Sequence, residues 1–235
     1  MAEQSKIEWT DHTFNPWEGC QKDTHTQKAV KRINLAIERG GTGVDLSILG
    51  IQEIPEELLK LADTLKWLYF HHTNVSDISS LADLTNLEDL YFRHTKVSDV
   101  SPLANLTKLR ALGFGCTNVS DISPLAHLTK LKALYLDNAV VSDISPLADL
   151  TNLIVLDLGG TNVSDISPLA NLTNLKELHL DNTVVSDISS VANLKKLKWL
   201  NLSEHPLVKS QANIQALKRL NENGCKIYGV EEFVT

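Results

Sequence analysis

The stretch LTNLEDLYFRHTKVSDVSPLAN, residues 84–105, decides the fold, because close variants of it recur along most of the chain. Its apolar residues return every 22 positions and so form columns. A fixed period of this length is typical of a solenoid, in which one repeat cannot bury its apolar face without its neighbours. We therefore expect an α/β solenoid that forms a single domain. Three of the columns contain Leu65, Leu87, Leu109, Leu131, Leu153, Leu175 and Leu197, then Leu68, Leu90, Leu112, Leu134, Leu156, Leu178 and Leu200, then Phe70, Phe92, Phe114, Leu136, Leu158, Leu180 and Leu202.

Each repeat is expected to contain a short strand with the pattern LxxLxL or LxxLxF, a turn and a second apolar cluster. In the central repeats this cluster includes Ser-Pro-Leu-Ala, for example at residues 101–104. A serine before a proline is typical of a helix start, in which the serine oxygen caps free amides. Because only about one turn fits before the next strand, we predict a short 3₁₀ or α turn there.

The pattern divides the chain into four segments. Residues 1–23 lie outside the repeat and form an N-terminal tail that we expect to be flexible. Residues 24–42 form a capping helix, residues 43–207 hold one divergent and seven regular repeats, and residues 208–235 form a C-terminal cap. Both caps are needed because the open ends of a solenoid would otherwise expose core leucines to water.

Local signals place a helix in each cap. The first is predicted over residues 26–39, with Thr26 as its N-cap and Gly40 just after its end. The second follows Ser210 as its N-cap and turns its apolar side inward. The segment CKIYGV, residues 225–230, is expected to add a final strand.

Composition limits the classes of function. A net charge of −7 and a pI near 5.6 argue against sequence-independent binding to nucleic acid, which requires a basic field. The three cysteines are far apart and odd in number, which indicates free thiols in a reducing compartment. The first residues, MAEQSKIEWTDHTF, lack the apolar run of a signal peptide, and no stretch is long and apolar enough for a membrane span. We therefore predict a cytoplasmic protein.

The phrases SDISPLADLTNL, residues 142–153, and SDISPLANLTNL, residues 164–175, resemble the bacterial leucine-rich repeats of internalin type. This resemblance covers about residues 65–207. It implies a right-handed leucine-rich-repeat horseshoe with a concave parallel β-sheet, short turns on the convex side and protein binding through the concave side. The family's usual asparagine in the turn is replaced here, so the hydrogen bonds at that position must differ. The replacing threonines are Thr73, Thr95, Thr117, Thr161 and Thr183.

Two further resemblances are local. SKIEWTDHTFNPWEGC, residues 5–20, resembles the start of a phage-associated radical-SAM-like family. The two cysteines that follow closely in that family are missing after Cys20, so the resemblance implies a borrowed leader rather than an iron–sulfur enzyme. GVDLSILGIQEIPEEL, residues 43–58, resembles the leucine-rich portions of bacterial Roco proteins, but no GTPase domain is present in this sequence.

Residues that alternate with the core leucines in each strand should point out to the concave face. They vary strongly from repeat to repeat, and tyrosine, tryptophan and arginine are common in interface hot spots. Glycines between them, such as Gly113 and Gly115, are expected to let a bulky group of a partner approach. The alternative is that exposed aromatics only satisfy strand propensity and packing. The predicted partner-binding residues are Trp67, Tyr69, His71, Tyr91, Arg93, Tyr135, Asp137, Asp157, His179, Asp181 and Trp199.

Catalytic and metal sites are weakly supported. His72, His94 and Cys116 occupy one column and could in principle hold zinc, but a straight column makes a line rather than a cup. Each of six repeats has one aspartate directly after a serine, in a segment called the Ser-Asp turn below. This aspartate is better explained by backbone capping than by catalysis. We predict a monomeric, non-enzymatic protein-interaction module with no cofactor or metal. The alternatives are a metal-dependent protein or enzyme that uses this edge, or an orphan regulatory subunit. The aspartates are Asp77, Asp99, Asp121, Asp143, Asp165 and Asp187.

Overall fold

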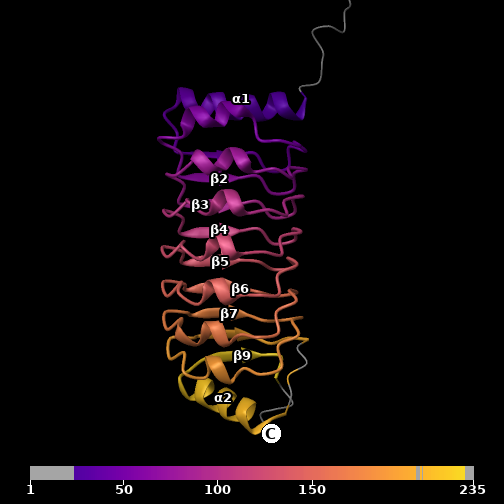
Figure 1. Ribbon diagram of the computed structural model, residues 1–235, viewed down its shortest axis with the longest axis vertical. Coiled ribbons are helices and arrows are strands. Elements are labelled where there is room, and N and C mark those ends of the chain that lie inside the picture. The colour runs from indigo at the N-terminus through magenta and orange to yellow at the C-terminus, as the bar shows by residue number, and fades with distance from the viewer. Residues whose placement is uncertain (1–23, 205–206, 208, 231–235) are drawn as a thin grey trace, which may run out of the picture.

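The computed structural model describes residues 24–204, 207 and 209–230, so the predicted tail at residues 1–23 lies outside the described part. Nine parallel strands follow one another in sequence order in a single sheet, and an α-helix lies at each end (Figure 1). The strands are β1 (Gly43–Asp45), β2 (Trp67–Tyr69), β3 (Asp89–Tyr91), β4 (Ala111–Gly113), β5 (Ala133–Tyr135), β6 (Val155–Asp157), β7 (Glu177–His179), β8 (Trp199–Asn201) and β9 (Lys226–Tyr228). The predicted right-handed leucine-rich-repeat solenoid with a concave parallel sheet is confirmed.

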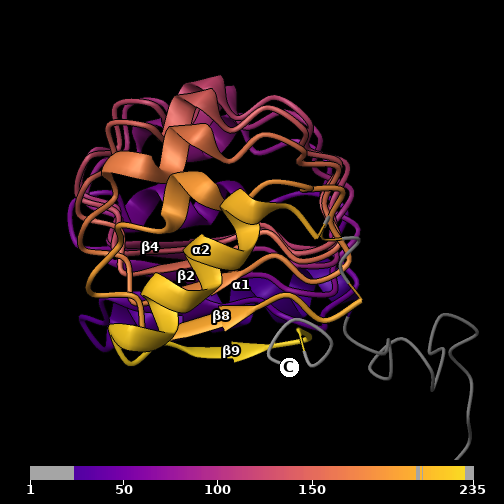
Figure 2. The same ribbon diagram turned by 90° about the horizontal axis from the view of Figure 1, so that it is seen from below.

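A row of 3₁₀ helices lies on the opposite side of the interior from the sheet (Figure 2). One to two turns fit between the loop after each strand and the next strand, and all of these short helices adopt the tighter 3₁₀ geometry, one of the two forms that the sequence predicts. The helices are η1 (Glu56–Leu61), η2 (Ser79–Asp83), η3 (Ser101–Leu103), η4 (Ser123–Leu125), η5 (Ser145–Leu147), η6 (Ser167–Asn171) and η7 (Ser189–Val191).

One continuous core fills the space between the sheet and the 3₁₀ helices. The central leucine of every strand from β2 to β8 points into this core and lies opposite its equivalent in the next strand, as Leu68 does with Leu90. The rings of Phe70, Phe92 and Phe114 form a stacked row inside the first repeats. Their centroids are 5.3 and 5.5 Å apart. The same columns that define the repeat therefore define the interior.

The threonine column is buried and bonds within its own repeat. In each case the Thr Oγ1 hydroxyl donates to the backbone carbonyl three residues earlier, as from Thr95 to Phe92 at 2.9 Å and from Thr161 to Leu158 at 2.6 Å. An asparagine amide could donate two hydrogen bonds, whereas a hydroxyl donates one. Each of these turns is therefore held by one side-chain hydrogen bond within its own repeat.

The start of each 3₁₀ helix corrects one prediction and confirms another. The N-cap of η3 is Val100, not Ser101, and no side chain caps its free amides. Instead the Ser101 N–H donates to Asp99 Oδ1 at 2.8 Å, and the Ser101 hydroxyl donates to Asp99 Oδ2 at 2.9 Å. The serine cap is therefore wrong, because the hydroxyl is already engaged by the aspartate. The predicted backbone role of the aspartates is confirmed in all six Ser-Asp turns.

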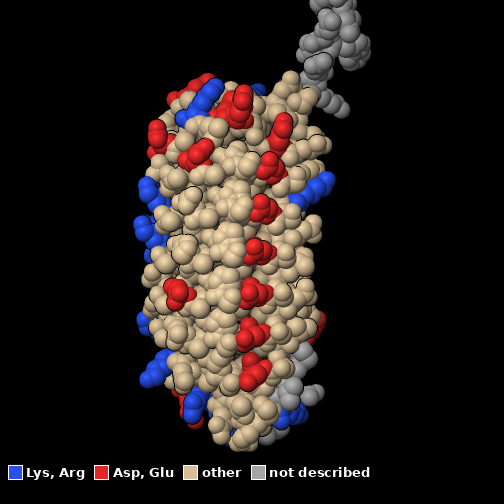
Figure 3. Space-filling view, in the orientation of Figure 1, with Lys and Arg blue, Asp and Glu red and all other residues tan. Residues whose placement is uncertain are grey.

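These turns give the convex side its most regular surface feature. A straight row of acidic side chains runs along the face that carries the 3₁₀ helices (Figure 3). The backbone hydrogen bond from the serine two residues later lowers the pKa of Asp77, Asp121 and Asp165. The row is thus a by-product of a turn that every repeat needs.

Helix α1 (His25–Glu38) covers the first repeat with the buried side chains of Ala29 and Ile33. Its N-cap is Thr24, not the predicted Thr26. Thr24 has extended dihedral angles and accepts from the Gln27 N–H, while the Gln27 side chain accepts from the Thr24 N–H. This reciprocal pair needs a threonine three residues before a glutamine, a spacing that Thr26 lacks.

Helix α2 (Gln211–Glu222) covers the last repeat, and Ser210 caps it as predicted by accepting from the Asn213 N–H. Asn213 itself is buried at the end of the core. Its Oδ1 accepts from the Ile188 N–H at 2.9 Å and its Nδ2 donates to the Ser186 carbonyl at 2.8 Å. No helix in the described part of the chain combines the length and the apolar character that a membrane crossing needs.

Candidate functional site

An aromatic run, defined here as Trp67, Tyr69, His71, Tyr91 and Tyr135, covers the concave face near its N-terminal end. Ring centroids lie 5.0 Å apart between Trp67 and Tyr69, and 5.4 Å apart in an edge-to-face pair between Tyr69 and Tyr91. His71 lies 5.8 Å from Tyr69, and Tyr135 lies 6.1 Å from Tyr91. Because each ring touches the next, the run is a connected surface rather than a set of isolated side chains.

Strand β4 is called the bare strand here, because it lies at the centre of this face and its repeat has glycines at two outward positions. Gly113 ends β4 and Gly115 lies two residues beyond it, so side chains of the repeats on either side can meet above them. A Cβ atom on Gly113 would lie 2.6 Å from Tyr91 Cδ1, and one on Gly115 would collide with the Asp137 carboxylate. The two glycines therefore make room for the chain's own Tyr91 and Asp137. That they also admit a bulky group of a partner stays a prediction.

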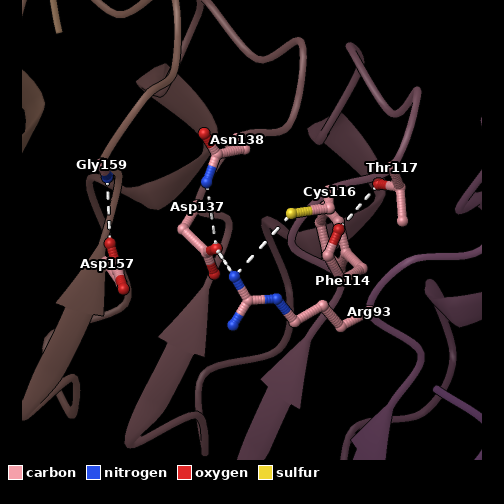
Figure 4. Close-up of polar contacts among 8 residues, drawn as sticks. All are labelled: Arg93, Phe114, Cys116, Thr117, Asp137, Asn138, Asp157 and Gly159. Atoms are coloured by element: carbon pink, nitrogen blue, oxygen red, sulfur yellow. Dashed lines mark hydrogen bonds and ion pairs between the residues drawn. The ribbon is translucent and has the colours of Figure 1, made fainter. Parts of the chain in front are cut away.

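Arg93 and Asp137 form an ion pair across the bare strand, with Arg93 Nη2 2.5 Å from Asp137 Oδ2 (Figure 4). The two residues are 44 positions apart, or two repeats. Asn138 Nδ2 also donates to Asp137 at 3.3 Å, and Cys116 Sγ lies 3.8 Å from the Arg93 guanidinium. The Asp137 side chain is 13% exposed and that of Arg93 48%, so the cation covers the anion.

Asp157 lies beside this ion pair on β6. Its Oδ1 accepts from the Gly159 N–H at 2.9 Å (Figure 4). Burial is the largest influence on its carboxyl group and raises the pKa, and the negative charges of Asp137 and Asp181 raise it further. The Gly159 hydrogen bond and His179 act in the opposite direction without reversing the shift.

An open depression of about 470 Å³ lies on the face where these groups meet. It brings together six of the predicted partner-binding residues. A larger hollow of about 840 Å³ lies away from the sheet face, between the start of α1 and the turns of the first repeats, and contains none of the predicted partner-binding residues. The depression on the concave face is lined by His71, Tyr91, Arg93, Gly113, Gly115, Tyr135, Asp137 and Asp157.

The other predicted residues lie outside the depression. Trp67 and Tyr69 continue the aromatic run, and the Asp181 Oδ1 accepts from the Asn201 side chain at 2.8 Å. Trp199 stacks on Tyr228 at 4.4 Å, at the opposite end of the sheet. His179 lies on the outward side of β7.

Tyr228 is a surface residue that the sequence analysis missed. Its strand β9 was predicted only as an end cover, yet Tyr228 pairs in register with Asn201 and so extends the outward column. Its ring is 41% exposed. Extending the alternation of the strands through the segment CKIYGV would have identified it.

The column of His72, His94 and Cys116 has a conformational explanation. These residues have φ angles of 52°, 53° and 54°, in the left-handed region that the turn after each strand requires. The two histidine rings stack at 4.4 Å. Among residues 24–204, 207 and 209–230, no group of three or more His, Cys, Asp or Glu is arranged so that it could hold a metal ion.

Because Tyr91 is packed within the aromatic run, we expect the folded chain to lose stability at alkaline pH. Burial, aided by Tyr135 and Asp89, raises the pKa of Tyr91 from 10.0 to about 12. Between these values the folded chain holds a proton that the unfolded chain releases, so stability should fall as pH rises from about 10 to 12. Tyr91→Phe should reduce this loss in melting temperatures measured against pH, and Tyr228→Phe, at an exposed ring, should not. An unchanged profile for Tyr91→Phe would contradict the packing described above.

A parallel-stranded solenoid with one strand and one 3₁₀ turn per repeat is the architecture of leucine-rich-repeat proteins. The family model described as Leucine Rich repeats (2 copies) matches residues 63–105 and 151–193. The chain is similar to the crystal structure of internalin C2 from Listeria monocytogenes, with 29% identity and a TM-score of 0.74 over 78% of this chain and 86% of that chain. The repeat matches and this structural similarity support an internalin-type bacterial leucine-rich-repeat protein.

A second structure agrees with this assignment. Internalin InlF from Listeria monocytogenes is 25% identical, with a TM-score of 0.62 over 88% of this chain and 75% of that chain. Comparison with curated protein sequences gives no match. The family-model matches do not extend to residues 5–20, so the resemblance of that segment to a radical-SAM-like family has no support from them.

Proposed function

We propose that this chain is a protein-interaction module that binds a protein partner through the concave face of its sheet. The observation that carries the proposal is the difference between the two sides of the same strands. The inward side carries leucine at the centre of every strand from β2 to β8, whereas the outward side changes from strand to strand. Core packing requires the first pattern, whereas the outward residues differ from repeat to repeat although the strands that carry them are equivalent.

The size and the rigidity of the face support a protein partner. Nine strands at a spacing of about 4.8 Å extend over roughly 38 Å, which suits a protein interface better than a small molecule. The rings of the aromatic run hold one another in place before any partner arrives. Little side-chain entropy then remains to be lost on association.

We also infer a non-enzymatic role. The most regular array of carboxylates, in the six Ser-Asp turns, accepts backbone hydrogen bonds and so has a structural explanation. A cytoplasmic location and a monomeric state stay predictions from the sequence. The expected location decides which lysate fraction is used in the experiment below, and the expected monomeric state decides the protein concentration.

Truncation of the centre of the face should weaken partner binding. We expect Tyr91→Ala and Arg93→Ala each to cost about 2 kcal/mol or more, because residues of these types, when held in place at an interface centre, act as hot spots. Immobilised wild-type and variant chains would be exposed to the same bacterial lysate, and the retained proteins quantified. Lys96→Ala is the control, since Lys96 is exposed and lies beyond the strand and its turn.

The three variants must first show the melting temperature of the wild type. A partner retained by the wild type and by Lys96→Ala, but lost from Tyr91→Ala and Arg93→Ala, supports the concave face. Equal retention by all three variants would contradict the proposal and move the interface elsewhere on the molecule.

A further inference from the structure

The depression on the concave face carries an excess of negative charge. Asp137 and Asp157 line it, and Asp181 lies close enough to influence Asp157. Arg93 is the only Lys or Arg in its lining, and it is paired with Asp137. Among the described residues, no Lys or Arg forms an ion pair with Asp157 or Asp181.

The wall beside Asp157 is aromatic. Tyr135 is the register neighbour of Asp157 on the adjacent strand, and Tyr91 lies 6.1 Å beyond it, between ring centroids. The face of an aromatic ring attracts a cation, and the attraction grows when water is excluded. A cation in the depression would therefore contact a ring on one side and a carboxylate on the other.

The chain already shows which cation suits this surface. Arg93 extends past Cys116, in the intervening repeat, and reaches the Asp137 carboxylate from two repeats away (Figure 4). A guanidinium is planar, stacks on aromatic rings and presents a fork of N–H groups to a carboxylate, whereas an ammonium does neither as well. Asp157 offers the same kind of carboxylate one strand further on. His179 and Arg93 attract its charge, but no Lys or Arg of the described residues forms an ion pair with it.

We propose that an arginine side chain of the protein partner binds in this depression, stacked on Tyr135 and paired with Asp157. The inference rests on the proposed function of the concave face and names the chemistry that the partner must present there. The raised pKa of Asp157 agrees with it, because burial disfavours the charged carboxylate and a paired cation would stabilise that charge. Arg93 stays on Asp137 and closes the other side of the depression.

The test uses a small probe, so that it does not depend on knowing the partner. N-acetyl-arginine amide would be titrated into the full ¹⁵N-labelled chain, with N-acetyl-citrulline amide as the neutral probe of nearly equal shape. We expect saturable shifts of the Gly159 amide, whose N–H donates to Asp157, and of Tyr135. The arginine probe should bind about tenfold or more tighter than the citrulline probe, as one charge-assisted hydrogen bond would give.

Single-residue variants test whether the arginine probe binds at Asp157 and Tyr135. Asp157→Asn keeps an oxygen to accept from the Gly159 N–H but removes the charge, so the preference for arginine should disappear. Tyr135→Leu should weaken both probes, and Tyr135→Phe should retain binding. Asp165→Asn, in a Ser-Asp turn of the convex side, is the matched charge control and should change nothing.

Equal affinity for the two probes, no saturable shift, or an unaffected Asp157→Asn variant would overturn the inference. Wild-type melting temperatures would be required of every variant. The proposed function is judged separately, by retention of the partner on Tyr91→Ala and Arg93→Ala. A failed probe titration together with reduced retention would leave concave-face binding intact and remove only the arginine subsite.

Discussion

Phe92→Ala is expected to lower the free energy of unfolding by about 3–5 kcal/mol, the typical cost of removing a buried phenylalanine. Phe92 has no exposed surface and is stacked between Phe70 and Phe114. Because β3 is held on both sides by parallel strands, the neighbouring repeats cannot close the cavity. Urea denaturation monitored by circular dichroism would measure the change.

The matched control lies in the same repeat. Lys96→Ala alters an exposed position and should change stability by no more than about 0.5 kcal/mol. Since each repeat of a solenoid contacts only its neighbours, the loss at Phe92 should also reduce the cooperativity between the two ends of the chain. A change below about 1 kcal/mol for Phe92→Ala would show that the phenylalanine row is not the packed core described above.

Asn213→Ala is expected to be nearly as damaging, although it removes only a polar side chain. The Ile188 N–H and the Ser186 carbonyl would lose their partner at the buried end of the solenoid. Each buried group left without a hydrogen bond costs about 1–3 kcal/mol. The loss should appear in urea denaturation as destabilisation of the C-terminal cap, and hydrogen exchange should locate it in η7 and α2.

Two variants separate this role from helix propensity. Gln215→Ala changes an exposed residue of α2 and should leave stability nearly unchanged. Asn213→Asp keeps an acceptor for the Ile188 N–H but cannot donate to Ser186 when ionised, so it should also destabilise. Stability equal to that of the wild type in Asn213→Ala would mean that α2 closes the solenoid through its apolar residues alone.

Local sequence signals were reliable where one residue type decides the outcome, and less so where two compete. Ser210 was correctly predicted as a helix cap, because a serine directly before an amphipathic stretch has few alternatives. The first cap was placed at Thr26 instead of Thr24, since both threonines lie at the start of the helical pattern and only the bond with Gln27 distinguishes them. Ser101, Ser145 and Ser167 fail as caps because the aspartate two residues earlier accepts a hydrogen bond from each hydroxyl.

The sequence by itself determined the solenoid, the direction of every core leucine and the identity of the outward face. A period of 22 residues repeated over most of the chain leaves one way to bury the apolar columns, and alternation in each strand then assigns the remaining residues to the other side. These properties depend on spacing along the chain, so a sequence is sufficient to reveal them.

Only the tertiary structure decided how the outward side chains combine. Arg93 meets Asp137, and Tyr91 approaches Tyr135, because the strand between them carries glycines and leaves space above it. These contacts depend on which side-chain rotamers the neighbouring strands leave open. They also depend on the free energy gained when a partly desolvated charge is paired. The spacing within one repeat encodes neither the open rotamers nor this gain, because the depression is lined by residues of five neighbouring repeats, from His71 to Asp157.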